Sequence, residues 1–329
     1  MMITGSSVLP KAAASLFREA FLMNTHKTIK LLLVISALFH ASEFFFCNIF
    51  FAQFSTPFFL SPVATATPEG KESFLYAYSI TRQYGFFAVQ LALLALFAAT
   101  NPTLYQHIIR LLALARCATA GLGVYAFAQG VLTPVQLIPS LLCNLALALA
   151  LFRFAPTERA AHRLDDELAL LPTKQIFGIT LSPILQWRLL QTMCLVAGGL
   201  WMLWGLGSTV FWEIGVANIS SDRVAEMNLL NAMQVNFIVR NQQGIMLFGI
   251  GAITALAAYF PVAHIRLLEF VMAQQVINAL SAAVELAFGA ILLPQFFTVF
   301  AVQVVTLILF YALYPKATES VLNETKREA

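Results

Sequence analysis

The chain is built from long apolar stretches separated by short polar breaks. At about 1.5 Å per helical residue, roughly 20 apolar residues cross the hydrocarbon core of a bilayer. Eight stretches reach that length, near 28–52, 74–99, 106–128, 134–154, 187–212, 233–260, 264–291 and 295–314. The pattern therefore predicts an all-α integral membrane protein with eight transmembrane helices.

Two halves of the chain carry the same ordered series of residues. Arg82 and Gly85 are followed by a proline, an Arg-Leu-Leu motif and a second proline, and Arg240 and Gly244 open the same series in the second half. This order indicates an internal repeat. Because four spans bring the chain back to its starting side, the two four-helix repeats are expected to be parallel. The predicted organisation is an N-terminal amphipathic segment, a first repeat, a cytoplasmic linker, a second repeat and a polar tail, at 1–27, 28–154, 155–186, 187–314 and 315–329.

Charge is scarce and unevenly placed. Of the 329 residues, 60% are hydrophobic and 11% are charged, and the net charge is +3. About 25% of the residues in an ordinary soluble domain are charged, and a nucleic-acid-binding surface needs a basic patch, so both classes are excluded. Lys and Arg concentrate at the span ends that share a side with the termini, which predicts that both termini are cytoplasmic. The plasma or inner membrane and the endoplasmic reticulum both stay open.

Ionisable residues inside the spans are the candidate chemistry, because a charge at membrane depth normally has a partner or lines a wet cavity. Glu43 and Arg82 fall at a similar depth, about 12–13 Å below the outer ends of their spans. We expect one ion pair between these two residues and another between Arg240 and Glu285. His40 precedes Glu43 by three positions and is expected to share its helix face.

A third pair is expected nearer the cytoplasmic side, between Arg116 and Glu269 in different repeats. No second His or carboxylate stands at ligand spacing in the layer of His40, so we expect no metal site there.

The Arg-Gly opening of the second helix and the Arg-Leu-Leu opening of the third resemble the DoxX-like membrane superfamily. The resemblance covers about 28–154 and 187–314 and implies a four-helix unit, here fused in tandem. It transfers no catalytic residue.

These features favour an enzyme that acts by acid catalysis on a lipophilic, isoprenoid-like substrate, of the terpene cyclase (lyase) or isomerase type. A carboxylic acid in an apolar site can stay protonated and donate its proton. The candidate catalytic residues are Glu43, Glu285 and His40, and the candidate substrate-binding residues are Arg82, Arg240, Tyr84, Gln243 and Trp201. Neither a cofactor nor a metal is expected, and the expected partners are the bilayer and a lipophilic small molecule.

Two other classes stay open. Parallel repeats with paired charges at their interface also fit a small-molecule transporter or permease. A non-catalytic membrane subunit would use the same ion pairs only to hold its helices together. The sequence does not decide among the three classes, nor does it give the oligomeric state.

Overall fold

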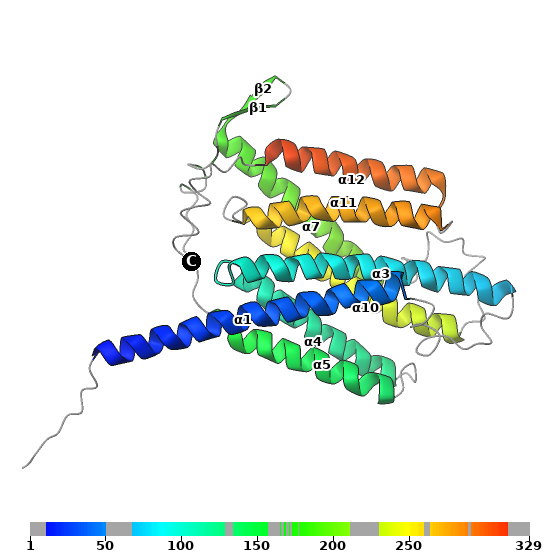
Figure 1. Ribbon diagram of the computed structural model, residues 1–329. Coiled ribbons are helices and arrows are strands. Elements are labelled where there is room, and N and C mark those ends of the chain that lie inside the picture. Colours follow the sequence, from blue (N-terminus) through cyan, green and yellow to red (C-terminus); the bar gives the residue numbers. More distant parts are fainter. Residues whose placement is uncertain are drawn as a thin grey trace, which may run out of the picture.

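We describe the chain from a computed structural model. It describes residues 11–50, 68–128, 134–156, 165, 168, 171, 173–176, 178–210, 230–259, 264–288 and 291–314, with side chains except at 11–24, 68–81, 126, 136, 176 and 230–243. The elements in chain order are α1 (Lys11–Asn48), α3 (Pro68–Thr100), α4 (Gln106–Ala128), α5 (Pro134–Phe154), β1 (Lys174–Ile176), β2 (Ile179–Leu181), α7 (Pro183–Val210), α10 (Leu230–Ala257), α11 (Ile265–Ala287) and α12 (Leu293–Leu313). The described chain is therefore mainly α-helical (Figure 1).

Seven helices of the described chain are long and apolar enough to cross a membrane. They are α1 from Thr25, α3 from Arg82, α4 to Tyr125, α5 from Leu137, α7, α11 and α12. In α10, the part with described side chains is the shorter apolar stretch Gly244–Ala257. The prediction of multiple membrane-spanning helices is thus supported for seven of the eight stretches.

Proline sets the start of several helices. Pro68, Pro134 and Pro183 are the first residues of α3, α5 and α7, and Pro294 is the second residue of α12. Proline fits the first turn, because its φ angle is already helical and the missing N–H would have no partner there. Pro139 lies inside α5 without ending that helix.

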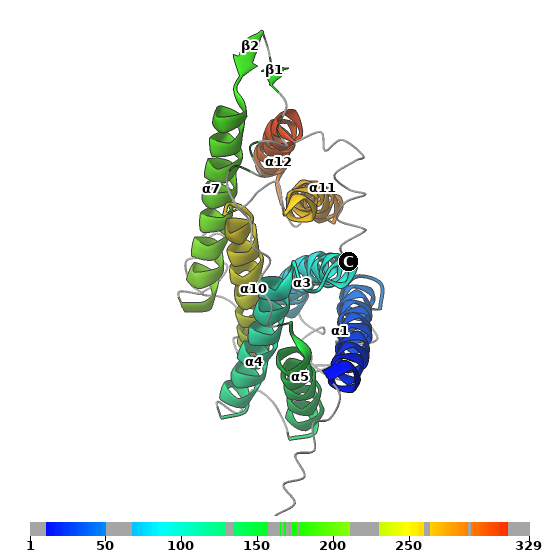
Figure 2. The same cartoon turned by 90° about the vertical axis from the view of Figure 1, so that its left-hand side faces the viewer.

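The helices pack in the same order in both halves. In the first half α1 lies against α3 and α5, and α4 lies against α5. In the second half α7 lies against α10 and α12, and α11 lies against α12. Between the halves, α3 packs on α10 and α11, and α10 packs on α4. Seen along the bundle, α3 and α10 stand between the α11–α12 pair and the α4–α5 pair (Figure 2).

The first described helix begins and the last one ends at the same end of the bundle, which we call the proximal end; the opposite end is the distal end (Figure 1). The turn between α3 and α4, the end of α10 and the start of α11 also lie at the proximal end. Helix α1 is continuous from Lys11 and extends past the other helices there, so no break separates the expected amphipathic segment from the first span.

A β-hairpin stands at the proximal end, within the segment expected to be a linker (Figure 1). Strands β1 and β2 pair antiparallel, with Lys174 opposite Leu181 and Ile176 opposite Ile179. Gly178 has a φ angle of 81°, a left-handed conformation that glycine adopts without steric cost. The part of this expected linker before the hairpin lies mostly outside the described residues.

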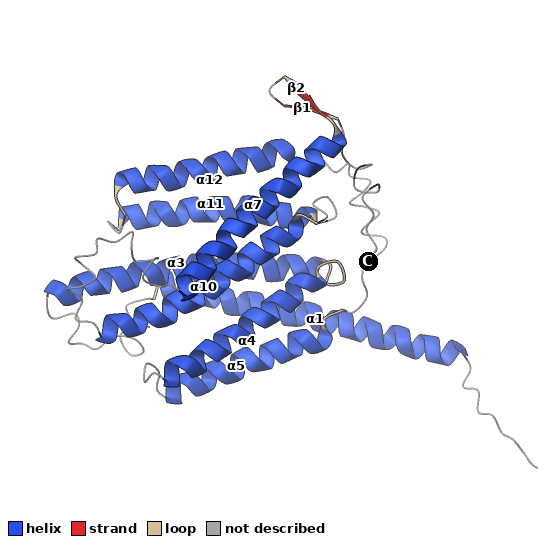
Figure 3. Ribbon diagram, turned by 180° about the vertical axis from the view of Figure 1, so that it is seen from behind, coloured by secondary structure: helices blue, strands red, loops and turns tan. Residues whose placement is uncertain are grey.

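Helices α7 and α10 run side by side and obliquely to α11 and α12 (Figure 3). A Cβ atom on Gly198 would lie 2.6 Å from the carbonyl oxygen of Gly251, and one on Gly205 would lie 2.6 Å from that of Gly244. Small residues permit such close backbone approach between membrane helices. Gly198 and Gly205 are seven residues apart on α7, and so are Gly244 and Gly251 on α10. The same close contact therefore recurs after two helical turns.

Candidate functional site

A hydrogen-bonded polar network lies among the four helices of the first half. On α1, His40 Nδ1 and Glu43 Oε2 are 2.8 Å apart, as their spacing of three residues predicted. On α3, the Tyr84 hydroxyl donates a hydrogen bond to Glu43 Oε1 at 3.0 Å. These three residues were predicted as site residues from the sequence, and the structure brings them together.

Arg116 on α4 and Asn144 on α5 complete the network. Arg116 Nη2 lies 2.7 Å from His40 Nε2, and its Nη1 donates to Asn144 Oδ1 at 3.1 Å. Arg116 Nη1 also lies 3.9 Å from Glu43 Oε1, and the guanidinium stands 4.5 Å from the ring centre of Phe39. Each of the four described helices of the first half, α1, α3, α4 and α5, therefore contributes a side chain to this network.

The protonation state of His40 follows from its neighbours. Arginine has only donors, so His40 Nε2 must accept the hydrogen bond from Arg116. The imidazole is then neutral, and its Nδ1–H donates to Glu43. Glu43 consequently accepts hydrogen bonds on both carboxylate oxygens, one from His40 and one from Tyr84.

Access to the network differs among its members. The side chain of Glu43 is 18% exposed, against 3% for His40 and 5% for Arg116. Tyr84 and Asn144 are also buried. Glu43 is therefore the member that a molecule from outside the helix bundle can reach.

The expected pair between Arg82 and Glu43 is wrong. Arg82 on α3 donates from Nε and Nη2 to the two carboxylate oxygens of Glu285 on α11, at 3.1 and 3.2 Å. Tyr84 lies two residues beyond Arg82, so the side chains of the two residues point to different faces of α3. The face of Tyr84 meets α1, whereas the face of Arg82 meets the second half of the chain.

The Arg82–Glu285 pair is buried between the halves. Both side chains are 2% exposed, and the Arg82 guanidinium stands 4.0 Å from the ring centre of Phe288. Two parallel hydrogen bonds and an aromatic face are the arrangement that a guanidinium favours. Glu285 was expected to bind Arg240. It binds Arg82, and the side chain of Arg240 lies outside the described residues, so a contact with Arg240 stays a prediction.

The expected pair between Arg116 and Glu269 is also wrong. Arg116 belongs to the network of the first half, whereas Glu269 accepts hydrogen bonds from Arg266 at 2.6 Å and from the Tyr314 hydroxyl at 2.8 Å. Burial and the bond to Glu269 raise the pKa of Tyr314. Tyr105, in the turn before α4, is buried beside the same group, and its burial raises its pKa as well.

The remaining predicted site residues are less well placed. Trp201 on α7 contacts the Phe87 ring edge-on, with ring centres 6.4 Å apart, and thus packs between the halves. The side chain of Gln243 lies outside the described residues. Among the aromatic residues near the site, Phe44 packs on Phe86, whereas Trp204 is 52% exposed and points away from the bundle.

Sequence reasoning missed Asn144 and misassigned Arg116. The signal for Arg116 was its position inside a span, where a charge requires a partner. Asn144 carried no signal beyond being a polar residue in an apolar stretch. The described residues contain no group of three or more His, Cys, Asp or Glu side chains that could hold a metal ion.

Seven long apolar helices, with buried ion pairs among the charged residues they carry, are compatible with a multi-pass membrane protein. Comparison with protein-family models, with curated proteins and with solved structures finds no match for this chain.

Proposed function

We propose that the chain is an integral membrane enzyme that moves a proton on a lipophilic, isoprenoid-like substrate, with Glu43 as the group that exchanges the proton. The proposal includes eight transmembrane helices in two parallel repeats with both termini in the cytoplasm. The matching order of helix contacts in the two halves supports the repeat. Glu43 carries the catalytic part, because it is the accessible end of an otherwise buried network.

The hydrogen bonds around Glu43 favour a base over an acid as the starting state. A carboxylate that accepts a bond on each oxygen is stabilised in its ionised form. It can therefore take a proton from a substrate carbon and return it to another carbon, which shifts a double bond. Of the two reaction types expected from the sequence, this geometry supports the isomerase better than the cyclase, which needs a protonated acid at the start.

A carboxylate removes a proton from carbon only when a neighbouring group makes that C–H bond acidic. The favoured substrate is therefore an unsaturated carbonyl compound with an isoprenoid chain, in which the electron pair of the broken C–H bond spreads onto the carbonyl oxygen. In the reaction the C–H bond breaks and the proton passes to Glu43, where it exchanges with water. Glu43 then gives a proton to the far end of the allylic system, as the electron pair held on the carbonyl oxygen returns to that carbon.

The buried neighbours of Glu43 hold it in place and adjust its charge. His40 fixes the position of Oε2, and Arg116 lies close enough to stabilise the negative charge on the carboxylate. Arg116 is itself fixed by Asn144. Glu285 has no such access, because both of its oxygens bind Arg82 and its side chain is 2% exposed.

Deuterium exchange tests this proposal without knowledge of the natural substrate. The purified protein in lipid vesicles is incubated in deuterium oxide with a β,γ-unsaturated ketone carrying a farnesyl-length chain. Mass spectrometry then follows deuterium uptake and double-bond migration. We expect the Glu43→Gln variant to lose about 10²–10⁴-fold in exchange rate, the usual contribution of a positioned acid or base.

Glu269→Gln is the matched control, because Glu269 is a partly exposed carboxylate outside the network. It is expected to keep the exchange rate of the unmodified chain. Equal rates for the Glu43 variant and the unmodified chain, or no exchange above that of protein-free vesicles, would contradict the proposal.

A second candidate function is supported by a different observation. The Arg82–Glu285 pair is buried where the two halves meet, which is where transporters with parallel repeats bind their substrates. If the chain is a transporter, it takes up a solute into vesicles. Glu285→Gln then abolishes this uptake, and Glu43→Gln leaves its rate unchanged. The enzyme proposal predicts the opposite dependence on these two residues.

A further inference from the structure

The contact between α3 and α11 contains a row of polar residues. Arg82 binds Glu285, and two turns further along both helices Gln90 Nε2 donates to Asn278 Oδ1 at 2.8 Å. From the first pair to the second, α3 advances from residue 82 to 90 while α11 goes back from residue 285 to 278. The two helices therefore run antiparallel and keep a regular register. The same register places Gln274, one turn beyond Asn278, level with Leu94.

Several amide atoms in this row have no hydrogen-bond partner among the described residues. They are Gln90 Oε1, Asn278 Nδ2, and both Oε1 and Nε2 of Gln274. Gln90 and Gln274 are fully buried, and Asn278 is 9% exposed. A buried polar atom without a hydrogen bond destabilises the fold by about 1–3 kcal/mol, so four such atoms in one helix contact would be strongly destabilising.

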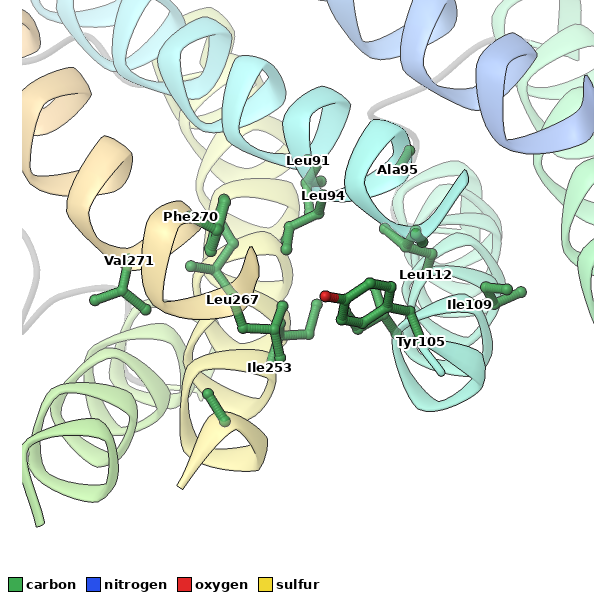
Figure 4. Packing of buried hydrophobic residues seen from close by; sticks show 14 of the residues in the cluster. Leu91, Leu94, Ala95, Tyr105, Ile109, Leu112, Ile253, Leu267, Phe270 and Val271 are labelled. Atoms are coloured by element: carbon green, nitrogen blue, oxygen red, sulfur yellow. The ribbon is translucent and has the colours of Figure 1, made fainter. Parts of the chain in front are cut away.

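The proximal side of this row is closed by apolar side chains. Leu91 and Leu94 of α3 lie close to Phe270 and Leu267 of α11 and to Ile253 of α10 (Figure 4). All five residues are buried. The row of polar atoms therefore ends at Gln274 and does not continue through the bundle.

We propose that the contact between α3 and α11 holds ordered water molecules between the Gln90–Asn278 pair and Gln274. The unpartnered atoms comprise two acceptors and two donors with no net charge, and water supplies both functions at once. Gln274 and Asn278 are one helical turn apart, about 6 Å along the axis, and two hydrogen bonds of about 2.8 Å span that distance. A buried water typically makes about three hydrogen bonds, which these amides and the helix carbonyl oxygens offer.

The charges around the site agree with a neutral ligand. Arg82 and Glu285 neutralise each other two turns away, and the facing side chain at the level of Gln274 is Leu94. Gln275, the neighbour of Gln274, donates its amide to the Val271 carbonyl of its own helix, so its amide N–H is already used. The unused donors and acceptors thus gather on the face of α11 that meets α3.

The Gln274→Leu variant tests this inference. Its thermal unfolding midpoint is compared with that of the unmodified full chain, both in lipid nanodiscs. A dry, unpartnered amide is destabilising, so its replacement by leucine would raise the unfolding midpoint. An amide that binds water shared with Asn278 gives the reverse result, because leucine leaves the partner groups unpaired. We expect the midpoint to fall by about 3 °C or more. Gln275→Leu is the matched control and is expected to change the midpoint less.

The double variant Gln274→Leu with Asn278→Leu sharpens the test. If both residues hold the same water molecules, the second substitution removes groups that the first has already left unpaired, so the fall in the midpoint is smaller than the sum of the single effects. A rise in the midpoint of the Gln274→Leu variant, or strictly additive effects, would overturn the inference. A high-resolution experimental structure of the unmodified chain needs no variant: solvent density within hydrogen-bond distance of the Gln274 amide supports the proposal, and its absence overturns it.

Discussion

The hydroxyl group of Tyr84 donates a hydrogen bond to Glu43, and this bond joins α3 to the carboxylate of α1 that we propose as the proton-exchanging group. Tyr84→Phe removes the bond and leaves a partly buried carboxylate oxygen with one partner fewer. We expect the variant to lose about 1–3 kcal/mol of unfolding free energy, measured by SDS titration of the detergent-solubilised protein. Tyr311→Phe serves as the control, because Tyr311 is 73% exposed on α12 and its loss is expected to be small. Equal losses for both variants would contradict the assigned bond.

The buried pair of Arg82 and Glu285 predicts an asymmetric response to mutation. Replacing either residue alone leaves a buried charge without its partner, which typically costs about 3–5 kcal/mol. Replacing both, as in Arg82→Met with Glu285→Leu, removes the charges together and is expected to cost less than either single change. A double-mutant cycle in SDS unfolding measures the coupling energy, and a value near zero would show that the pair does not form.

The close contact of α7 with α10 predicts that an alanine substitution is destabilising at one glycine of α7 and is tolerated at the next. A methyl group on Gly198 would collide with the backbone of α10, whereas one on Gly199 meets nothing within 4 Å. Gly198→Ala is expected to cost about 1–3 kcal/mol through overpacking. Gly199→Ala gains helix propensity without a clash, so its unfolding free energy stays equal or rises. The two variants are compared in the same unfolding assay.

Burial of Tyr105 predicts a loss of stability at alkaline pH. Its pKa in the folded chain is raised above the ordinary value of 10.0, so the folded state holds the phenolic proton more tightly than the unfolded state does. The resulting stabilisation is complete below about pH 10 and is lost as the pH rises toward the folded-state pKa. Tyr105→Phe should flatten this part of the profile of unfolding midpoint against pH. An unchanged alkaline slope in the variant would contradict the prediction.

Labelling of single cysteines tests the proposed orientation. In a background without the four native cysteines, Thr180→Cys places a thiol on the β-hairpin at the proximal end, and Leu292→Cys places one at the distal end. Both positions are exposed. If the termini are cytoplasmic, a membrane-impermeant maleimide added to intact cells labels only Cys at position 292. The reverse pattern would invert the topology.

Several features of this structure could be read from the sequence because they depend on local rules. The positions of the apolar helices follow from segment length, and the His40–Glu43 bond follows from a spacing of three residues on one helix. The placement of Tyr84 in the site followed from its depth. Each of these inferences needed only the geometry of one span or the depth of a residue within it.

The pairing of charges between helices could not be predicted in the same way. Depth gave the right layer for Arg82, but two acids lay in that layer, and the choice depends on which face of α3 meets which helix. Tyr84, two residues beyond Arg82, lies on the face of α3 that meets α1, where Arg82 was expected. Asn144 and Gln274 were missed because a lone amide in an apolar helix carries no sequence signal until its neighbours are known.

The crossing of α3 with α11 has a consequence for the synthesis of the protein. Arg82 is translated about two hundred residues before Glu285, so about three-fifths of the chain is synthesised between the two residues. During that interval the Arg82 guanidinium lacks the carboxylate that binds it in the folded chain. The contact between α3 and α11 is therefore completed late in synthesis, only after α11 has been translated.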